Sequence, residues 1–227
     1  MAERSMKLRM VFLALAIAVA GAPAASSAHT DYYYLDPRQV DLTALLPPPP
    51  DVASAEERSD EEQVASAVAG RTHSETFAAE EESARTVFFY APSVGAEFTA
   101  QRLPVTAAFF ARIGSDVKAL VDGAKAYWER PRPSGVQKRR GSYPSGHAAF
   151  AAASAIVLAQ LLPEKRDAIF TQARTFAENR ILLGLHYPSD VASGWTAGTL
   201  AVYVMMQDAA FRRDYAAAAA ELRRANL

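Results

Sequence analysis

Two histidines, a hydroxyl, one carboxylate and several fixed cations are grouped in three short segments of this chain. The segments, in chain order, contain Lys125, Arg132 and Pro133; then Pro144, Ser145, Gly146 and His147; then Arg180, His186 and Asp190. Displacement at a tetrahedral oxyanion needs cations for the oxygens, a nucleophile, a proton donor, and an anion that fixes the nucleophile's tautomer. The three segments together supply each of these groups.

The second segment predicts the start of a helix that faces an anion. Ser145 is a favourable N-cap residue, and Gly146 lets the backbone approach a ligand closely. The first-turn N–H groups and the helix dipole then favour a negative charge, with His147 beside it. An ordinary capped helix with a chance histidine is the alternative interpretation.

The third segment predicts an oriented histidine. His186 and Asp190 are four residues apart, and Pro188 between them suits the first turn of a helix. This spacing puts both side chains on one helix face, so Asp190 can hold one imidazole nitrogen while the other attacks. A purely structural His–Asp pair would have the same spacing.

The cations complete the expected site. We expect the turn at Gly184 to fold Arg180 back beside His186, while Lys125 and Arg132 come from the first segment. Arginine binds phosphate oxygens in two-pronged fashion, and lysine acts as a point charge. Solvated surface charge is the alternative, and we interpret residues 138–140 (Lys-Arg-Arg) in that way, as a basic loop near the mouth of the site.

The whole chain fits one folded domain with a local, not global, positive charge. It has 227 residues, half of them apolar, and a formal net charge of −1, so no nucleic-acid partner is indicated. It has no cysteine, which excludes disulfides, thiolate metal sites and cysteine nucleophiles.

The first 58 residues are expected to precede the folded domain. Residues 1–28 have the basic start, short apolar run and small-residue end of a signal peptide, which predicts a periplasmic or secreted protein without stable membrane insertion after cleavage. The apolar run is too short for a comfortable transmembrane anchor. Residues 29–58 are expected to form an extended strap, in which Tyr32 to Tyr34 dock and Pro47 to Pro50 run as polyproline II. A loose linker is the alternative.

Residues 59–227 predict an all-α fold, a single compact bundle of about seven or eight helices. A capping box at Ser59 and Glu62 would start the first of them. The expected helices cover residues 60–70, 75–89, 103–113, 115–128, 145–162, 164–183, 189–207 and 209–225. Gly114 is expected to split the two middle ones. The 189–207 segment is apolar nearly all round and is expected to be the central buried helix, with Gly194 and Gly198 allowing close packing.

In this order and spacing, the three segments resemble the signature of the type 2 phosphatidic acid phosphatase superfamily, which includes vanadium haloperoxidases. The chain is most similar to the secreted class A bacterial non-specific acid phosphatases, because of the signal peptide, the proline-rich strap, and Gly141 to Tyr143 before the second segment. The resemblance implies an all-α helical bundle and hydrolysis of small phosphate monoesters, with homo-oligomers as one option.

The resemblance also implies a role for each site residue. His186 would be the nucleophile that forms a phosphohistidine, Asp190 would orient it, and His147 would protonate the leaving alcohol and then activate water. The phosphoryl oxygens would be held by Lys125, Arg132, Ser145, Gly146 and Arg180. No metal or other cofactor is implied. An acid optimum is expected because His147 must start protonated and an ordinary histidine has a pKa of about 6.5.

Three departures from the family pattern bear on the site. Asn179 stands where serine is common, and Pro131 stiffens the approach to Arg132. The 134–143 loop is shorter than usual, which predicts an open mouth and broad substrate tolerance.

Several functions remain open on sequence grounds. The alternatives are a vanadate-dependent haloperoxidase, a lipid phosphate phosphatase and a periplasmic phosphate-binding protein that is not an enzyme. The last would explain the cations but not two histidines with Asp190 beside them. The natural ester, and the balance between transfer of phosphate to water and to alcohols, are not encoded in the motifs.

Overall fold

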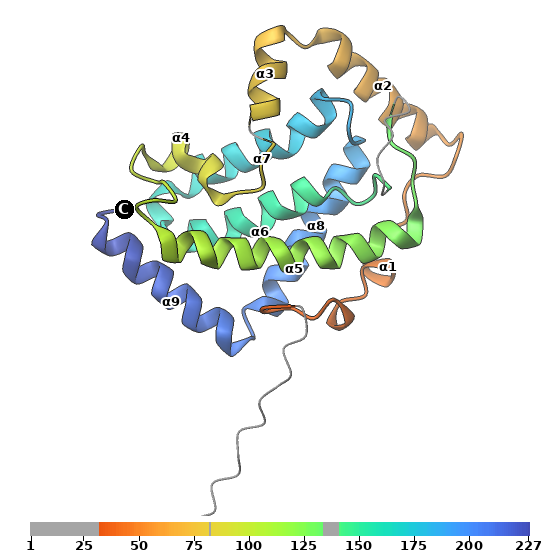
Figure 1. The fold of residues 1–227 in the computed structure, drawn as a ribbon. Helices are drawn as coiled ribbons and strands as arrows, with labels where there is room; N and C mark the ends of the chain where they lie inside the picture. The colour runs from red at the N-terminus through yellow and green to blue at the C-terminus, as the bar shows by residue number, and fades with distance from the viewer. Residues whose placement is uncertain (1–31, 82, 134–140) are drawn as a thin grey trace, which may run out of the picture. The chain divides into compact units, whose positions relative to one another are not determined.

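A computed structural model of the chain describes residues 32–227 except 82 and 134–140, within one compact unit (Figure 1). All regular elements of the described residues are helices, which confirms the all-α prediction. The α-helices are α1 (Leu42–Leu45), α2 (Ala55–Gly70), α3 (His73–Glu81), α4 (Ala91–Val94), α5 (Pro104–Trp128), α6 (Gly146–Leu161), α7 (Arg166–Leu182), α8 (Pro188–Met205) and α9 (Ala209–Arg224). Short 3₁₀ turns cover Pro37–Gln39, Val87–Tyr90 and Pro163–Lys165. The expected signal peptide and basic loop lie outside the described residues.

Helix α6, not α8, is the central helix. It packs against α5, α7 and α8, and all but a few of its residues are buried. The prediction that residues 189–207 form the central helix is wrong, because Ala192, Thr196 and Tyr203 leave one face of α8 exposed. The alanine-rich sequence of α6 suits the centre because small side chains let three neighbouring helices approach. Within the described ranges, no helix combines the length and apolar character that a membrane crossing requires.

The two glycines of α8 set its distance from α6, as predicted. A Cβ atom added at Gly194 would lie 2.3 Å from the Ser145 carbonyl oxygen, and one at Gly198 would lie 2.1 Å from that of Ala149. Real side chains cannot approach backbone so closely. The pair therefore brings the start of α8 against the start of α6, where the second and third motifs meet.

Helix α5 runs without a break through Gly114, so the expected split there is wrong. An isolated glycine costs a helix only about 1 kcal/mol relative to alanine, which packing readily outweighs. The Phe150 ring of α6 lies on Gly114, with Cε2 3.1 Å from the position of an added Cβ. Figure 1 shows α5 as one uninterrupted helix. Lys125 therefore lies on the same helix as the buried phenylalanines of its first half.

The N-terminal helices differ from expectation at their ends. Ser54, not Ser59, caps α2 by accepting a hydrogen bond from the Glu57 amide, so the helix begins before the expected end of the strap at residue 58. Both serines precede a glutamate by three residues, and nothing in the intervening sequence stops the helix. Helix α3 ends at Glu81 instead of continuing to Phe89.

The first described residues of the strap are docked on α5. The backbone amides of Tyr33, Tyr34 and Leu35 donate to the buried Asp116 carboxylate of α5 at 2.7–3.2 Å. Tyr34 is buried against aromatic rings of α5 and α9. The predicted docking of the aromatic cluster is therefore confirmed for Tyr34, and the loose-linker alternative does not hold for this segment.

Candidate active site

One cavity, of about 310 Å³, gathers most of the residues singled out in the sequence. It is lined by Arg85, Lys118, Asp122, Lys125, Arg132, Gly146, His147, Arg180, Leu185 and His186. Six of these belong to the predicted set. They come from the last turn of α5, the segment that follows α5, the start of α6, the end of α7 and the turn before α8. The remaining two predicted residues, Ser145 and Asp190, lie buried directly behind the lining.

His186 and Asp190 form the expected oriented pair. His186 Nδ1 is 3.2 Å from Asp190 Oδ2, which also accepts the Tyr187 amide at 2.9 Å. Because a carboxylate only accepts, Nδ1 must carry the proton, and this leaves a lone pair on Nε2. Burial, with the Lys125 and Arg132 charges added, lowers the His186 pKa to about 4 against the opposing effect of Asp190. The imidazole is therefore neutral at mildly acidic pH.

The charge of Asp190 is maintained although the side chain is fully buried. Burial alone would raise its pKa, but the hydrogen bond with His186 and the nearby Arg130 charge outweigh burial and hold the pKa below its ordinary value. Asp190 is thus an anion throughout the range in which His186 is neutral.

Arg132 contacts the nucleophilic face of His186. Its Nη1 lies 3.1 Å from His186 Nε2 and donates to the Leu185 carbonyl oxygen at 2.7 Å, while Nη2 donates to Gly141 at 3.2 Å. Its Nε has no partner among the described residues. Arg132 therefore has hydrogen-bonding capacity to spare for an oxyanion.

Lys125 is buried at the wall of the cavity. Its Nζ donates to the carbonyl oxygens of Gly141 and Ser142, at 2.8 and 2.6 Å. An ammonium has three donors, so one is left for a ligand. Burial, aided by the Arg132 charge, lowers the Lys125 pKa to about 7. Gly141 packs closely against the Arg130 backbone because it has no side chain. An added Cβ would lie only 3.1 Å from the Arg130 nitrogen.

His147 also lines the cavity. Its Nε2 is 3.1 Å from the Ser83 carbonyl oxygen, so this nitrogen carries a proton. Burial, together with the Arg180 and Arg85 charges, lowers its pKa to about 3. The expectation of an ordinary His147 pKa near 6.5 is therefore wrong for this environment.

Helix α6 starts at this cavity, as predicted. Ser145 caps it by accepting the Ala148 amide at 3.4 Å, and its own amide donates to the Asp190 carbonyl oxygen at 2.8 Å. Gly146 follows in the cavity lining. Arg180 is buried at the end of α7, where Nη2 donates to the Ala79 carbonyl oxygen at 2.7 Å and ties α7 to α3.

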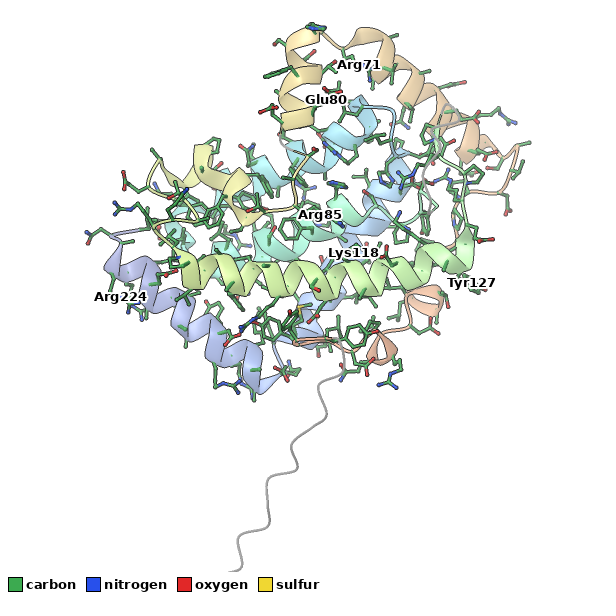
Figure 2. All side chains as sticks on the ribbon, viewed as in Figure 1. Arg71, Glu80, Arg85, Lys118, Tyr127 and Arg224 are labelled. Atoms are coloured by element: carbon green, nitrogen blue, oxygen red, sulfur yellow. The ribbon has the colours of Figure 1, made fainter. Side chains whose placement is uncertain are left out.

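Sequence reasoning missed three charged lining residues. Arg85 comes from the segment after α3, and Lys118 comes from α5 (Figure 2). Lys118, two turns before Lys125, forms an ion pair with Asp122, one turn before Lys125. The spacing of 118, 122 and 125 places them on one face of α5, which was the available signal. Five cations and a single carboxylate thus line the cavity among the described residues. Within those residues, no cluster of three or more His, Asp or Glu side chains is placed to hold a metal ion.

Two further missed residues stand behind His186. Arg130 donates to Asp190 Oδ1 at 2.7 Å and to Asp60 Oδ2 of α2 at 2.9 Å. The sequence motif includes Arg132 but not Arg130, two residues earlier, so Arg130 was not predicted. Asp60 gave a weak signal, since it lies four residues before Val64 on the buried face of α2.

A second cavity, of about 430 Å³, adjoins the first and shares His147, Arg180 and Leu185 with it. Its other lining residues are Arg71, Thr76, Glu80, Ser83 and Leu183, from α2, α3 and the end of α7. Figure 2 labels Arg71, directly after α2, and Glu80 of α3. His147 therefore stands at the junction of two cavities.

Comparison with known proteins agrees with this geometry. The region from α5 into α9, residues 104–214, matches the PAP2 superfamily model, and it contains all three motifs. Residues 104–214 form a PAP2 superfamily domain. The resemblance drawn from the motifs is thereby confirmed.

Named relatives of the PAP2 domain are acid phosphatases. The acid phosphatase of Zymomonas mobilis is 31% identical over 150 residues, which cover 60% of this chain and 56% of that protein. The non-specific acid phosphatases of Salmonella typhi and Providencia stuartii are 32% and 34% identical, over 41% and 34% of this chain and 37% and 31% of their own. The matches thus span about half or less of these relatives.

The fold has a solved counterpart. A transmembrane PAP2 type phosphatidylglycerolphosphate phosphatase from Bacillus subtilis superposes with a TM-score of 0.51, over 73% of this chain and 89% of that one. The sequences are 18% identical, so this likeness concerns the fold alone.

Proposed function

We propose that the protein is a secreted or periplasmic acid phosphatase that hydrolyses small phosphate monoesters through a phosphohistidine on His186. The observation that carries the proposal is the pairing of two features. His186 directs a lone pair on Nε2 toward the cavity, and five cations surround that cavity. A phosphoryl group needs both a nucleophile and charge stabilisation in its transition state, and here side chains supply the charge.

In the first step, His186 Nε2 attacks phosphorus and the bond from phosphorus to the ester oxygen breaks. Arg132 must release Nε2 as it turns to the phosphoryl oxygens, for which Lys125, Arg180 and the Gly146 amide are further donors. The leaving oxygen takes a proton from His147. Asp190 stabilises the positive charge that forms on the His186 ring.

In the second step, water attacks the phosphohistidine. Neutral His147 accepts a proton from this water, the bond between phosphorus and Nε2 breaks, and inorganic phosphate leaves. Both histidines return to their starting states. An alcohol in place of water would give phosphotransfer by the same route, which we include in the proposal.

His147 must gain a proton before the first step, although its pKa in the empty cavity is about 3. The bound phosphate monoester supplies the missing negative charge, because an anion beside the imidazole favours its protonated form against burial and the Arg180 and Arg85 charges. Substrate binding thus favours protonation of His147, the acid catalyst. The acid pH optimum is then a property of the enzyme–substrate complex. The second cavity, reached past His147, is the natural place for the leaving alcohol.

The test is hydrolysis of p-nitrophenyl phosphate from pH 4 to 8 in excess EDTA, with His186→Ala as the matched variant. The proposal predicts activity that resists EDTA, is strongest on the acid side and is absent in the variant. Rapid quenching with labelled substrate should trap acid-labile phosphate on the wild-type chain only. Activity that EDTA removes, or that survives in His186→Ala, would contradict the mechanism.

Three further arms separate the alternatives. Halide oxidation with vanadate and peroxide would indicate a haloperoxidase, and preference for detergent-dispersed phosphatidate would indicate a lipid phosphatase. Tight phosphate binding without turnover would indicate a binding protein. A series of esters of increasing bulk tests the broad tolerance that the short 134–143 loop predicts, and sharp selectivity would contradict it.

A further inference from the structure

Arg130 bridges two carboxylates inside the protein, and neither it nor Asp60 lines the phosphate cavity. Nη1 of Arg130 lies 2.7 Å from Asp190 Oδ1, and Nη2 lies 2.9 Å from Asp60 Oδ2. The side chains of Arg130, Asp60 and Asp190 are 5%, 7% and 0% exposed. The guanidinium also lies over the Tyr187 ring, with 4.0 Å from Cζ to the ring centre.

Asp60 holds the start of α8 as well. Its Oδ1 accepts the Ser189 amide at 3.1 Å, and its Oδ2 accepts the Ser189 hydroxyl. Ser189 Oγ in turn lies 2.7 Å from Arg130 Nη1. The carboxylate of α2 is therefore bonded both to the arginine behind Asp190 and to the backbone next to Asp190.

We propose that Arg130 and Asp60 are positioning residues that fix the orientation and charge of Asp190 and, through it, the attacking nitrogen of His186. The proposal rests on the function proposed above for His186. It also extends the site beyond the PAP2 domain, because Asp60 precedes residues 104–214.

The orienting effect follows from how the two Asp190 oxygens are shared. Arg130 takes Oδ1, so that Oδ2 alone faces His186 Nδ1 and the Tyr187 amide. A planar guanidinium bonded at two nitrogens cannot rotate without losing a contact, which fixes the carboxylate plane. The direction of His186 Nε2 into the cavity is then set from behind.

The charge effect requires Asp60. Arg130 alone would neutralise Asp190 and weaken its support for the cationic ring of the phosphohistidine. A second carboxylate on the far side of the guanidinium offsets the arginine charge at similar distance. The order Asp60, Arg130, Asp190, His186 thus leaves one net negative charge for His186 to use.

The experiment compares wild type with Asp60→Asn, Arg130→Lys and Arg130→Met. Arg112→Met, which removes the remote ion pair with Asp214, is the matched control for loss of an arginine–aspartate pair. We expect kcat for p-nitrophenyl phosphate to fall on the order of 10- to 100-fold, as is typical when an outer partner of an orienting carboxylate or histidine is removed. KM and the inhibition constant of inorganic phosphate should change little, because neither residue lines the cavity.

Lysine should rescue only in part, since one ammonium cannot reproduce the two-pronged bridge. Arg130→Met leaves two buried carboxylates without their cation and is prone to unfold, so Asp60→Asn, an uncharged isostere, carries the test in that case. Retention of kcat within about twofold of wild type in folded Asp60→Asn and Arg130→Lys would overturn the proposal. An equal fall in phosphate affinity would also overturn it, as it would show general damage to the cavity.

A readout independent of turnover separates this proposal from the proposed function. In ¹⁵N-labelled wild type, the His186 Nδ1 proton should give a downfield, slowly exchanging resonance through its bond to Asp190. The resonance should exchange faster in Asp60→Asn and Arg130→Lys and stay unchanged in Arg112→Met. If wild type shows this resonance but no hydrolysis, the proposed function fails alone. If the variants leave the resonance unchanged, the positioning role fails.

Discussion

His147 is proposed to act as a general acid, although its surroundings lower its pKa to about 3. Burial and the charges of Arg180 and Arg85 favour the neutral ring. We predict that saturating inorganic phosphate raises the His147 pKa from about 3 toward neutral pH. Nuclear magnetic resonance of ¹³C-labelled histidine side chains, titrated with and without phosphate, measures the shift. His73, on the exposed surface of α3, provides the reference resonance. An identical His147 titration in both conditions would rule out priming by substrate.

Lys125 gives the cavity a second pH limit. Its pKa of about 7 means that the empty site loses a cation on the alkaline side. Sulfate keeps its double negative charge across this range, so it reports on the protein alone. We predict that sulfate inhibition weakens above about pH 7 in wild type, and that Lys125→Arg moves this decline to higher pH because arginine stays charged. Superimposable pH profiles for the two proteins would contradict the assignment to Lys125.

At the residue scale, the sequence predicted the residues in and next to the cavity better than the buried residues that support them. His186 and Asp190 could be paired because helix periodicity fixes their relation over four residues. Arg130 and Asp60 could not, since 70 residues separate them and the contact depends on where α2 packs. The lowered pKa of His147 was also out of reach, because it depends on burial and on Arg85 from another segment.

At the element scale, the contact between α6 and α8 holds the second motif against the third. We predict that Gly198→Ala destabilises the protein by about 1–3 kcal/mol, because the new methyl group would overlap the Ala149 carbonyl oxygen. The change must also overcome the gain of roughly 0.5–1 kcal/mol that alanine brings to a helix. Urea unfolding measures the difference.

Gly123 of α5 is the matched control for that prediction. It is exposed, and nothing lies within 4 Å of an added Cβ. Gly123→Ala should therefore leave stability unchanged or raise it. If Gly198→Ala were as stable as Gly123→Ala, the two helices would have to move apart easily, and close packing would not set the position of the motifs.

The helix boundaries that sequence reasoning missed share a physical cause. Ser54 and Ser59 both offer a cap three residues before a glutamate, and local sequence does not rank them. Gly114 breaks the periodic pattern of α5, yet the Phe150 ring restores the packing that the missing side chain would give. Such choices are made by tertiary contacts, whereas the starts of α6 and α8 are marked locally by Ser145 and Pro188.

At the scale of the whole molecule, the fold brings together cationic side chains whose mutual repulsion a bound anion would reduce. The cavity collects five cations, and two histidines beside them are kept neutral. By itself this arrangement is unfavourable because like charges are held together and partly removed from water. A phosphate anion would offset this repulsion, so the features that destabilise the protein are those that favour anion binding.

The free energy of unfolding should therefore decrease as the pH is lowered from 7, before the carboxylates begin to titrate. His147 and His186 have pKa values of about 3 and 4 in the folded protein, whereas in the unfolded chain both titrate near 6.5. Between these values the unfolded state binds more protons, so the free energy of unfolding rises with pH and is lost as pH falls below about 6.5. Urea unfolding between pH 7 and 5 should show this slope, and it should be shallower in His147→Gln. Excess phosphate should also flatten it, because a bound anion lets the folded state hold the same protons. A wild-type slope that matches that of His147→Gln would mean that the cavity leaves His147 unperturbed, and substrate priming of the acid would lose its physical basis.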